Sequence, residues 1–149
     1  MGVPAFQTGH VGLNVTDLRR SLDFYRAVFD FDVIGESYEP GREYAFLGLD
    51  GTLLLTLWQQ SDGKFDSRLP GLHHLSFQVP EIDAVRRAQS MLDRLGAVVH
   101  HGGIVPHGEG ASSGGVFFED PDGIRLEIYA PAGVTGVAPT TNVPTCGFF

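Results

Sequence analysis

Two histidines occupy the same place in two similar segments of the chain. Residues 10–18, HVGLNVTDL, align with residues 74–82, HLSFQVPEI, so that apolar residues share the same alternate positions and His10 corresponds to His74. A period of two is typical of β-strands and puts each histidine on the face opposite the apolar residues. Imidazole is a common metal ligand, and its repetition in two copies of one unit favours a shared role over two unrelated core histidines.

A glutamate near the end of the chain is the third residue of interest. Glu127 lies between Leu126 and Ile128, in a run that otherwise suits a buried strand. An unpaired buried carboxylate costs several kcal/mol, so a cation is its simplest partner. Two imidazoles and a carboxylate on separate strands would leave coordination positions open for substrate or oxygen. We expect one divalent ion per chain, Fe(II) first by ligand type, with Mn, Ni, Co or Zn as alternatives.

The elements that carry these residues repeat as one unit. Each strand is followed by an acidic turn and then by a helical stripe, formed by Leu18, Leu22, Tyr25 and Phe29 in the first copy and by Val85, Ala88, Leu92 and Leu95 in the second. Thr16 or Asp17 can cap the first helix, and Gly96 is placed to end the second. Three strand-like runs follow each helix, at 31–37, 43–49 and 52–58, and at 97–101, 115–119 and 124–130.

This order predicts an α+β fold in which paired βαβββ modules, about 8–60 and 72–130, form a curved mixed-sheet cup with helices outside. We expect a single domain over residues 1–131, with a Gly-rich loop at 102–115 rimming the cup. Residues 132–149 are rich in Pro, Thr and Gly without periodicity, which predicts an extended tail.

Three segments carry a resemblance to a known family: HVGLNVTDLRRSLDFYRAVF, HLSFQV and FFEDPDGIRLEIYAP. From about residue 8 to residue 131 the chain resembles the vicinal oxygen chelate superfamily, also called the glyoxalase, bleomycin resistance and extradiol dioxygenase group. The resemblance implies a metal in the cup, bound by residues that open the first and fifth strands and by a glutamate of the eighth. Those positions are His10, His74 and Glu127 here.

The resemblance also helps to separate reaction types. Many members have a fourth ligand, usually a glutamate, in the fourth strand of the first half. Matching Gly51 to Gly123 puts Leu55 opposite Glu127, and a slip of one residue gives Leu54 or Thr56, so no carboxylate stands there. This departure weakens a glyoxalase I reading and favours the three-ligand branches. The extradiol dioxygenase signature is matched in part by His107, Phe117, the Asp120–Gly123 turn and Glu127, although the family usually has tyrosine where Phe117 stands. His107 would donate a hydrogen bond to a metal ligand or act as a general acid, or else it is a solvated loop histidine.

Further residues are candidates for substrate contact because alternation or the resemblance places them beside the ligands. They are Asn14, Leu55, Gln78, Phe117, Arg125 and Tyr129. The sequence therefore predicts a metal-dependent dioxygenase for a small, partly apolar, oxygen-chelating substrate. A glyoxalase-type lyase or isomerase, and a metal-free binding protein like the bleomycin resistance proteins, are the alternatives. His73, next to His74, is expected to face the other way and not to be a ligand.

Composition and net charge indicate which classes of binding partner to expect. A net charge of −8 repels nucleic acid and anionic lipid, and no apolar run approaches the length of a membrane span. The single cysteine, Cys146, cannot form an internal disulfide, so the fold does not need an oxidising compartment. We therefore expect a cytoplasmic protein. Exposed strand edges and the resemblance suggest a homodimer. The terminal phenylalanines should dock on protein, either inside the cup, where Cys146 could reach the metal, or over the outer helices or the dimer seam.

Overall fold

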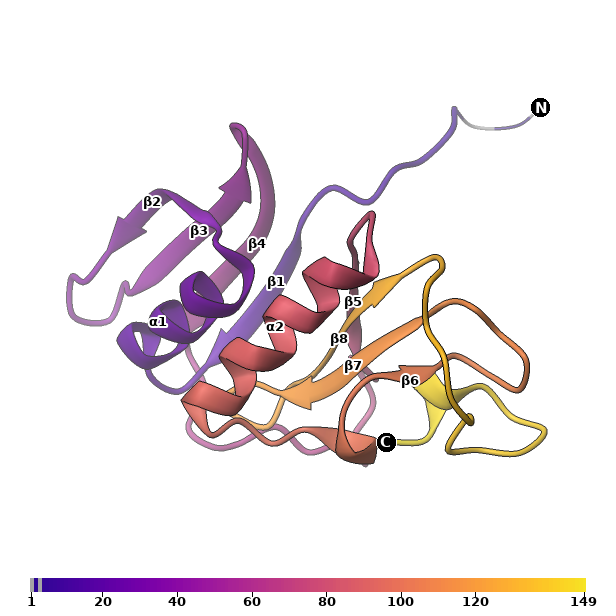
Figure 1. The fold of residues 1–149 in the computed structure, drawn as a ribbon. Coiled ribbons are helices and arrows are strands. Elements are labelled where there is room, and N and C mark those ends of the chain that lie inside the picture. Colours follow the sequence, from indigo (N-terminus) through magenta and orange to yellow (C-terminus); the bar gives the residue numbers. More distant parts are fainter. Residues whose placement is uncertain (1, 3) are drawn as a thin grey trace. The chain divides into compact units, whose positions relative to one another are not determined.

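The computed structural model describes residue 2 and residues 4–149 and divides into two compact units, Met1–Lys64 and Phe65–Phe149. Each unit contains one βαβββ module, in which a helix lies on one face of an open four-stranded mixed sheet (Figure 1). This confirms the predicted α+β class and the repeated module.

The first unit is built on the sheet order β1-β4-β3-β2. Its elements are β1 (Val11–Val15), α1 (Leu18–Phe29), β2 (Asp32–Ser37), β3 (Tyr44–Leu49) and β4 (Thr52–Gln59). β1 runs parallel to β4, and the other pairs are antiparallel. The sequence pattern therefore predicts the order of these elements correctly, and the predicted strand bounds differ from the observed ones by one residue at most.

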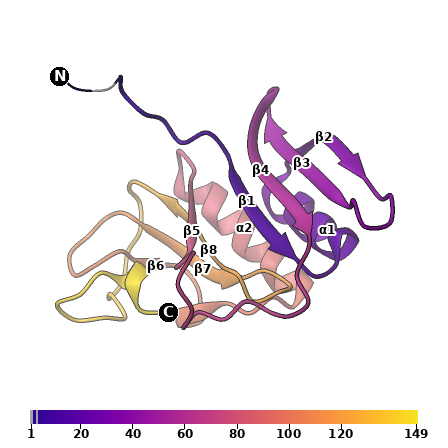
Figure 2. The same cartoon turned by 180° about the vertical axis from the view of Figure 1, so that it is seen from behind.

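The second unit repeats this topology with the order β5-β8-β7-β6 (Figure 2). Its elements are β5 (Leu75–Gln78), α2 (Ile82–Leu95), the short 3₁₀ turn η1 (His100–Gly102), β6 (Val105–Pro106), β7 (Gly114–Glu119), β8 (Arg125–Ala130) and a second 3₁₀ turn, η2 (Thr145–Gly147). Here β5 is parallel to β8. The two units thus place β5 and β1 in equivalent positions, with His74 and His10 immediately before them.

The helices bury the predicted stripes. α1 packs on β3 and β4, and α2 packs on β7 and β8. Of the predicted stripe residues, the buried ones are Leu18, Leu22 and Tyr25 in α1 and Val85, Ala88 and Leu92 in α2, whereas Phe29 is half-buried and Leu95 is 46% exposed. The Asp17 carboxylate accepts the Arg20 main-chain N–H and caps α1, and Gly96 ends α2 in the left-handed conformation with φ of 66°.

The predicted strand at 97–101 is wrong. Only Val99 forms an isolated bridge to Phe118, after which the chain turns through η1, where His101 adopts a left-handed φ of 57°. The edge strand of this sheet is instead the two-residue β6. The pattern misled because AVVHH suits a strand locally, whereas the following Gly102 and Gly103 allow a tight turn.

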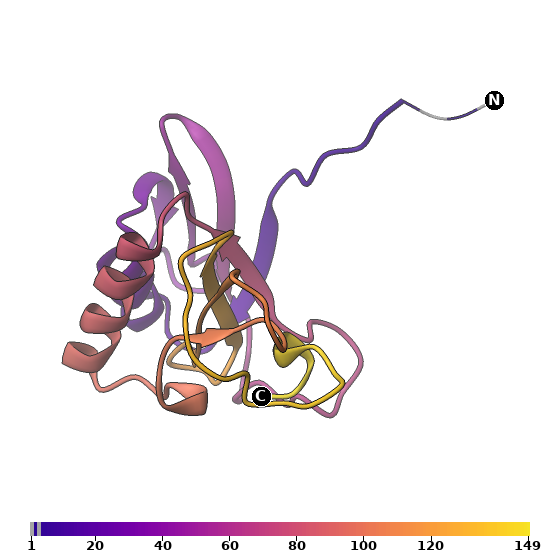
Figure 3. The ribbon, with the colours of Figure 1, turned by 45° about the vertical axis from the view of Figure 1, so that its right-hand side comes forward.

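The tail belongs to the second unit and is docked on it (Figure 3). The Val134 main-chain N–H donates to the Ser112 carbonyl, and the Thr145 N–H donates to the His107 carbonyl. Thr145 is completely buried. Among the described residues, neither helix has the length and apolar character needed to cross a bilayer.

Candidate active site

The site is built on the face of the second sheet that α2 does not cover. Leu126 and Ile128 of β8 are 0% and 3% exposed and belong to the core, and alternation turns Glu127 to the opposite face. Its partners across the sheet are Ser76 of β5 and Phe117 of β7. Three neighbouring strands therefore present side chains around one carboxylate.

Glu127 is 3% exposed, yet both of its oxygens have partners. Oε1 accepts the Ser76 hydroxyl at 2.7 Å and lies 3.8 Å from His74 Nε2. Oε2 lies 2.6 Å from His107 Nε2. A buried carboxylate with two imidazoles and a hydroxyl around it has little room for solvent, so its charge depends on these groups or on a cation.

His74 is held by its neighbour in the chain. Its Nδ1 lies 2.8 Å from His73 Nδ1, so one of the two rings donates and the other accepts. The predicted opposite orientation of His73 is therefore wrong, because β5 begins only at Leu75 and strand alternation does not extend to residue 73. Burial is the main effect that lowers the pKa of His74, against the charge of Glu127, which raises it. The neutral ring that a metal requires is therefore favoured.

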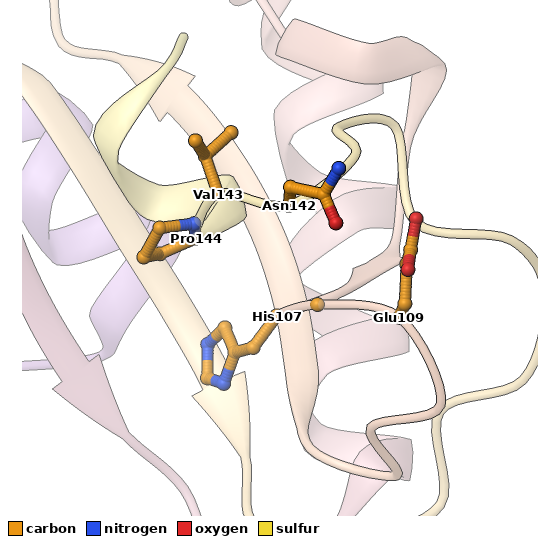
Figure 4. A pocket seen from close by; sticks show the side chains of 6 residues that line it. His107, Glu109, Asn142, Val143 and Pro144 are labelled. Carbon is orange, nitrogen blue, oxygen red and sulfur yellow. The ribbon is translucent and has the colours of Figure 1, made fainter.

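His107 connects the buried carboxylate to the surface. Since an ionised Glu127 can only accept, His107 Nε2 carries the proton, and Nδ1 can then accept the Ser113 hydroxyl at 3.0 Å. A shallow pocket of about 430 Å³ reaches His107 between the loop after β6 and the tail. Figure 4 shows its ring directed away from Glu109 and Asn142, which line the other side of that pocket.

Three of the predicted substrate contacts lie around this centre. The Tyr129 hydroxyl donates to the Gln78 amide oxygen at 2.8 Å, and the Tyr129 ring lies 4.9 Å from that of His107. Arg125 Nε donates to the His73 carbonyl at 3.0 Å, and another of its nitrogens bonds the main-chain oxygen of Phe149. Arg125 is thus a fixed oxygen-binding group in this unit.

The Phe149 ring lies against this face. Phe117, which is completely buried, contacts it with a centroid distance of 4.8 Å, and His74 does so at 5.5 Å. Cys146 is half-buried, and burial followed by the nearby charge of Glu127 raises the pKa of its thiol. Of the two positions considered for the tail, the Phe149 ring takes the one against this sheet face and not the one over the helices, while the protonated thiol is poorly suited to ligate a metal.

The first unit holds the remaining predicted residues. His10 is exposed immediately before β1, and the Asn14 side-chain oxygen accepts the Gln60 main-chain N–H at 2.9 Å. Leu55 is completely buried and pairs with Val11 in β1 and Leu47 in β3. It lies on the α1-covered face with Leu13 and Val15, so the structure does not offer its side chain to a ligand on the other face.

The strand register corrects the alignment of the two modules. The residue after His10 pairs with Leu55, whereas the residue after His74 pairs with Leu126. The counterpart of Glu127 is therefore Thr56, not Leu55. The glycine-based alignment slipped by one position because the β3–β4 connection spans two residues with a register shift, while five residues separate Glu119 from Arg125. The fourth-strand carboxylate is still absent.

The donor set of the second unit fits a divalent ion. His74 Nε2 and Glu127 Oε1 lie 3.8 Å apart, a little more than the roughly 3.4 Å between two tetrahedral ligands at about 2.1 Å from one ion, so a small approach would let both bind. Across the described residues, no group of three or more His, Cys, Asp or Glu side chains is gathered closely enough to hold a metal. The third predicted ligand, His10, lies in the first unit, so the complete set of His10, His74 and Glu127 stays a prediction.

Comparison with known proteins decides the family. The model of the Glyoxalase/Bleomycin resistance protein/Dioxygenase superfamily matches residues 7–128. The chain belongs to this superfamily. This vicinal oxygen chelate membership agrees with the fold, because a glyoxylase/bleomycin resistance protein/dioxygenase domain from Frankia sp. EAN1pec superposes with a TM-score of 0.70 at 27% identity. That match covers 85% of this chain and 98% of the Frankia chain.

Two curated relatives of this superfamily member are informative. The catechol-2,3-dioxygenase of Bacillus subtilis (strain 168) is 28% identical over 125 residues, which are 82% of this chain and 40% of that enzyme. The chain thus spans well under half the length of that relative. The uncharacterized protein YaeR of Escherichia coli (strain K12) is 29% identical over 128 residues, covering 83% of this chain and 95% of its own.

Sequence reasoning missed several residues of this site. Ser76 could have been found, because it lies two positions after His74 on the same face of the strand. The contacts of Phe149 with His73, His100 and His101 depend on the course of the tail and of η1, for which the sequence carries no periodic signal.

Proposed function

We propose that this chain is a divalent-metal-dependent vicinal oxygen chelate enzyme of the dioxygenase type, acting on a small, partly apolar substrate with two neighbouring oxygens. The observation that carries the proposal is the buried Glu127 carboxylate with the imidazoles of His74 and His107 on its two oxygens. Titratable side chains that converge on one partly buried sheet face are typical of catalytic sites.

His10, His74 and Glu127 would hold the ion, and Fe(II) is our first choice. When bound, the metal would act as a Lewis acid that lowers the pKa of a substrate hydroxyl. Ser76 and His107 keep the Glu127 carboxylate fixed, because each donates to a different oxygen. Thr56 at the position equivalent to Glu127 argues against a reaction that needs two metal-bound carboxylates.

His107 has the contacts expected of a proton-transfer group. Its Nε2 faces the buried carboxylate, Ser113 fixes Nδ1, and the side chain is 26% exposed next to the shallow pocket. A proton can therefore pass between solvent and the centre without unfolding the site. Tyr129 and Arg125 lie on the same face and supply a hydroxyl and a guanidinium for substrate oxygens.

Relatives support the superfamily directly and the dioxygenase reaction only through one partly covered relative. The superfamily description includes dioxygenases, and the Bacillus subtilis relative is a catechol dioxygenase of which this chain spans 40%. Substrate and reaction type are accordingly proposals for this chain.

Oxygen consumption tests the proposal. Protein freed of metal with a chelator and reloaded with Fe(II) should consume oxygen with small vicinal diphenols, and Glu127→Gln should abolish this while the exposed Glu81→Gln does not. His107→Gln should lower turnover by roughly 10²- to 10⁴-fold if it transfers a proton. Conversion of a hemithioacetal without oxygen consumption would point instead to the glyoxalase-type alternative, and binding without turnover to the bleomycin-resistance-like one.

A further inference from the structure

The Phe149 ring occupies a specific aromatic environment in the second unit. Its centroid lies 4.8 Å from Phe117, 5.5 Å from His74 and 5.3 Å from His100. The ring centroids of His73 and His101 lie 6.4 Å and 6.5 Å from that of Phe149. We call these five rings, together with Arg125, the Phe149 subsite.

Arg125 adds a polar end to this subsite. Its guanidinium carbon lies 5.2 Å from the centroid of the Phe149 ring, and it donates to the main-chain oxygen of the same residue. A second bond, from Nε to the His73 carbonyl, fixes its orientation. The subsite thus recognises a ring and an acceptor oxygen joined by a short saturated link.

The tail that delivers Phe149 is anchored outside the subsite. Thr145 donates its N–H to the His107 carbonyl and its hydroxyl to the Pro106 carbonyl, at 2.9 Å and 2.8 Å. The neighbouring Phe148 is 57% exposed, so only one of the two phenylalanines is inserted. Three residues lie between the Thr145 anchor and Phe149, so the ring can leave its subsite while the anchor stays.

Insertion of Phe149 conflicts with the other predicted uses of this face. Phe117 and Arg125 were both predicted to contact substrate, and both are in contact with Phe149. The ring also contacts His74, a predicted ligand. A substrate that reaches these groups must displace the ring first.

We propose that Phe149 is an internal competitor, and that its subsite binds small aromatic carboxylates whose ring and carboxylate are joined by a two-carbon link. This deepens the proposed function, on which it rests for the claim that the ligand is a substrate. The carboxylate would take the place of the Phe149 main-chain oxygen at Arg125, where the guanidinium donates a charge-assisted hydrogen bond to it. Only molecules with Phe149 released can bind the ligand, so the measured affinity is reduced to the fraction of such molecules. The reduction is about tenfold if the tail is seated in nine of ten molecules.

Calorimetric titration with 3-phenylpropanoate tests competition, using chelator-treated protein so that the result does not depend on metal. This probe repeats the ring, link and oxygen of Phe149. Phe149→Ala should bind it about tenfold more tightly than the wild type, and the control Phe148→Ala should match the wild type. Propanoate, which lacks the ring, and 3-phenylpropanol, which lacks the carboxylate, should bind weakly to both. Equal affinity in Phe149→Ala and wild type would overturn the proposal.

A measurement on the wild type guards against a misfolded variant. Hydrogen exchange at the Phe148 amide, which donates to the Thr145 carbonyl, should accelerate at saturating 3-phenylpropanoate, because the displaced tail loses this turn. Unchanged or slower exchange at saturation would show that ligand and tail do not compete. Binding with competition in a protein that never takes up metal would refute the proposed enzyme and leave the subsite intact.

Discussion

At the scale of single residues, the site depends on pairs that fix each other. His74 can ligate through Nε2 only if its Nδ1 carries the proton and donates to His73, since both Nδ1 atoms lie 2.8 Å apart. His73 is therefore a positioning residue for His74. The sequence placed His74 correctly before its strand, but the role of His73 depended on where β5 begins.

Replacing His73 tests this pair. His73→Phe keeps a ring beside Phe149 but removes the acceptor for His74, so affinity for a divalent ion should fall roughly ten- to hundredfold. His100→Phe is a matched control, because His100 also contacts Phe149 but pairs with Glu119. Metal titration of both variants measures the effect, and equal affinities would show that His73 does not orient His74.

A second residue sets a pH dependence of stability. Burial, and then the charge of His100, lower the pKa of His101, whose Nε2 is buried without a hydrogen-bond partner. As the pH falls below about 6.5, His101 is therefore protonated in the unfolded chain before it is protonated in the folded protein. Stability contributed by the neutral ring is full above that pH and is lost as the pH falls through the lowered folded-state pKa.

His101→Asn should reduce this loss, because asparagine tolerates the left-handed conformation at residue 101 but does not titrate. Urea unfolding at about pH 7.5 and about pH 5.5 gives the change in free energy for each protein. We expect a smaller decrease on acidification in the variant than in the wild type. An identical decrease would mean that His101 is not a source of the pH dependence.

At the scale of elements, the strongly periodic segments were predictable and the irregular ones were not. Helical stripes and period-two strands define α1, α2, β1 and β8 because each buries one face. The 97–101 segment failed because its apolar run belongs to an isolated bridge and a 3₁₀ turn. Register was misjudged for Leu55, since the sequence does not show that the two strand connections differ in length.

The cap of α1 offers a test of the element that lies between β1 and β2. Asp17→Ala removes the acceptor of the Arg20 N–H and should destabilise the protein by about 1 kcal/mol. Thr16→Ala is the control, since the Thr16 hydroxyl accepts a hydrogen bond from the Arg20 side chain. It should change stability by less than about 0.5 kcal/mol in the same urea titration. Equal losses would show that the Asp17 cap contributes no more to stability than the neighbouring surface contact.

At the scale of the whole molecule, we expect two copies to associate. The outer strands β2 and β6 leave main-chain groups at sheet edges, and closed two-fold dimers are the commonest way to cover such surfaces. Light scattering at micromolar concentration should give about twice the 16.1 kDa of one chain. A mass equal to one chain would contradict the dimer.

A divalent ion held by His10, His74 and Glu127 is the basis of the proposed enzyme activity. Elemental analysis of protein purified without chelator tests for it, in the wild type and in His10→Ala, His74→Ala and Glu127→Ala, with circular dichroism to verify folding. We expect one divalent ion per wild-type chain and loss of the ion from each folded variant. A wild-type protein without metal, or a fully metallated His74→Ala variant, would contradict the proposed metal centre.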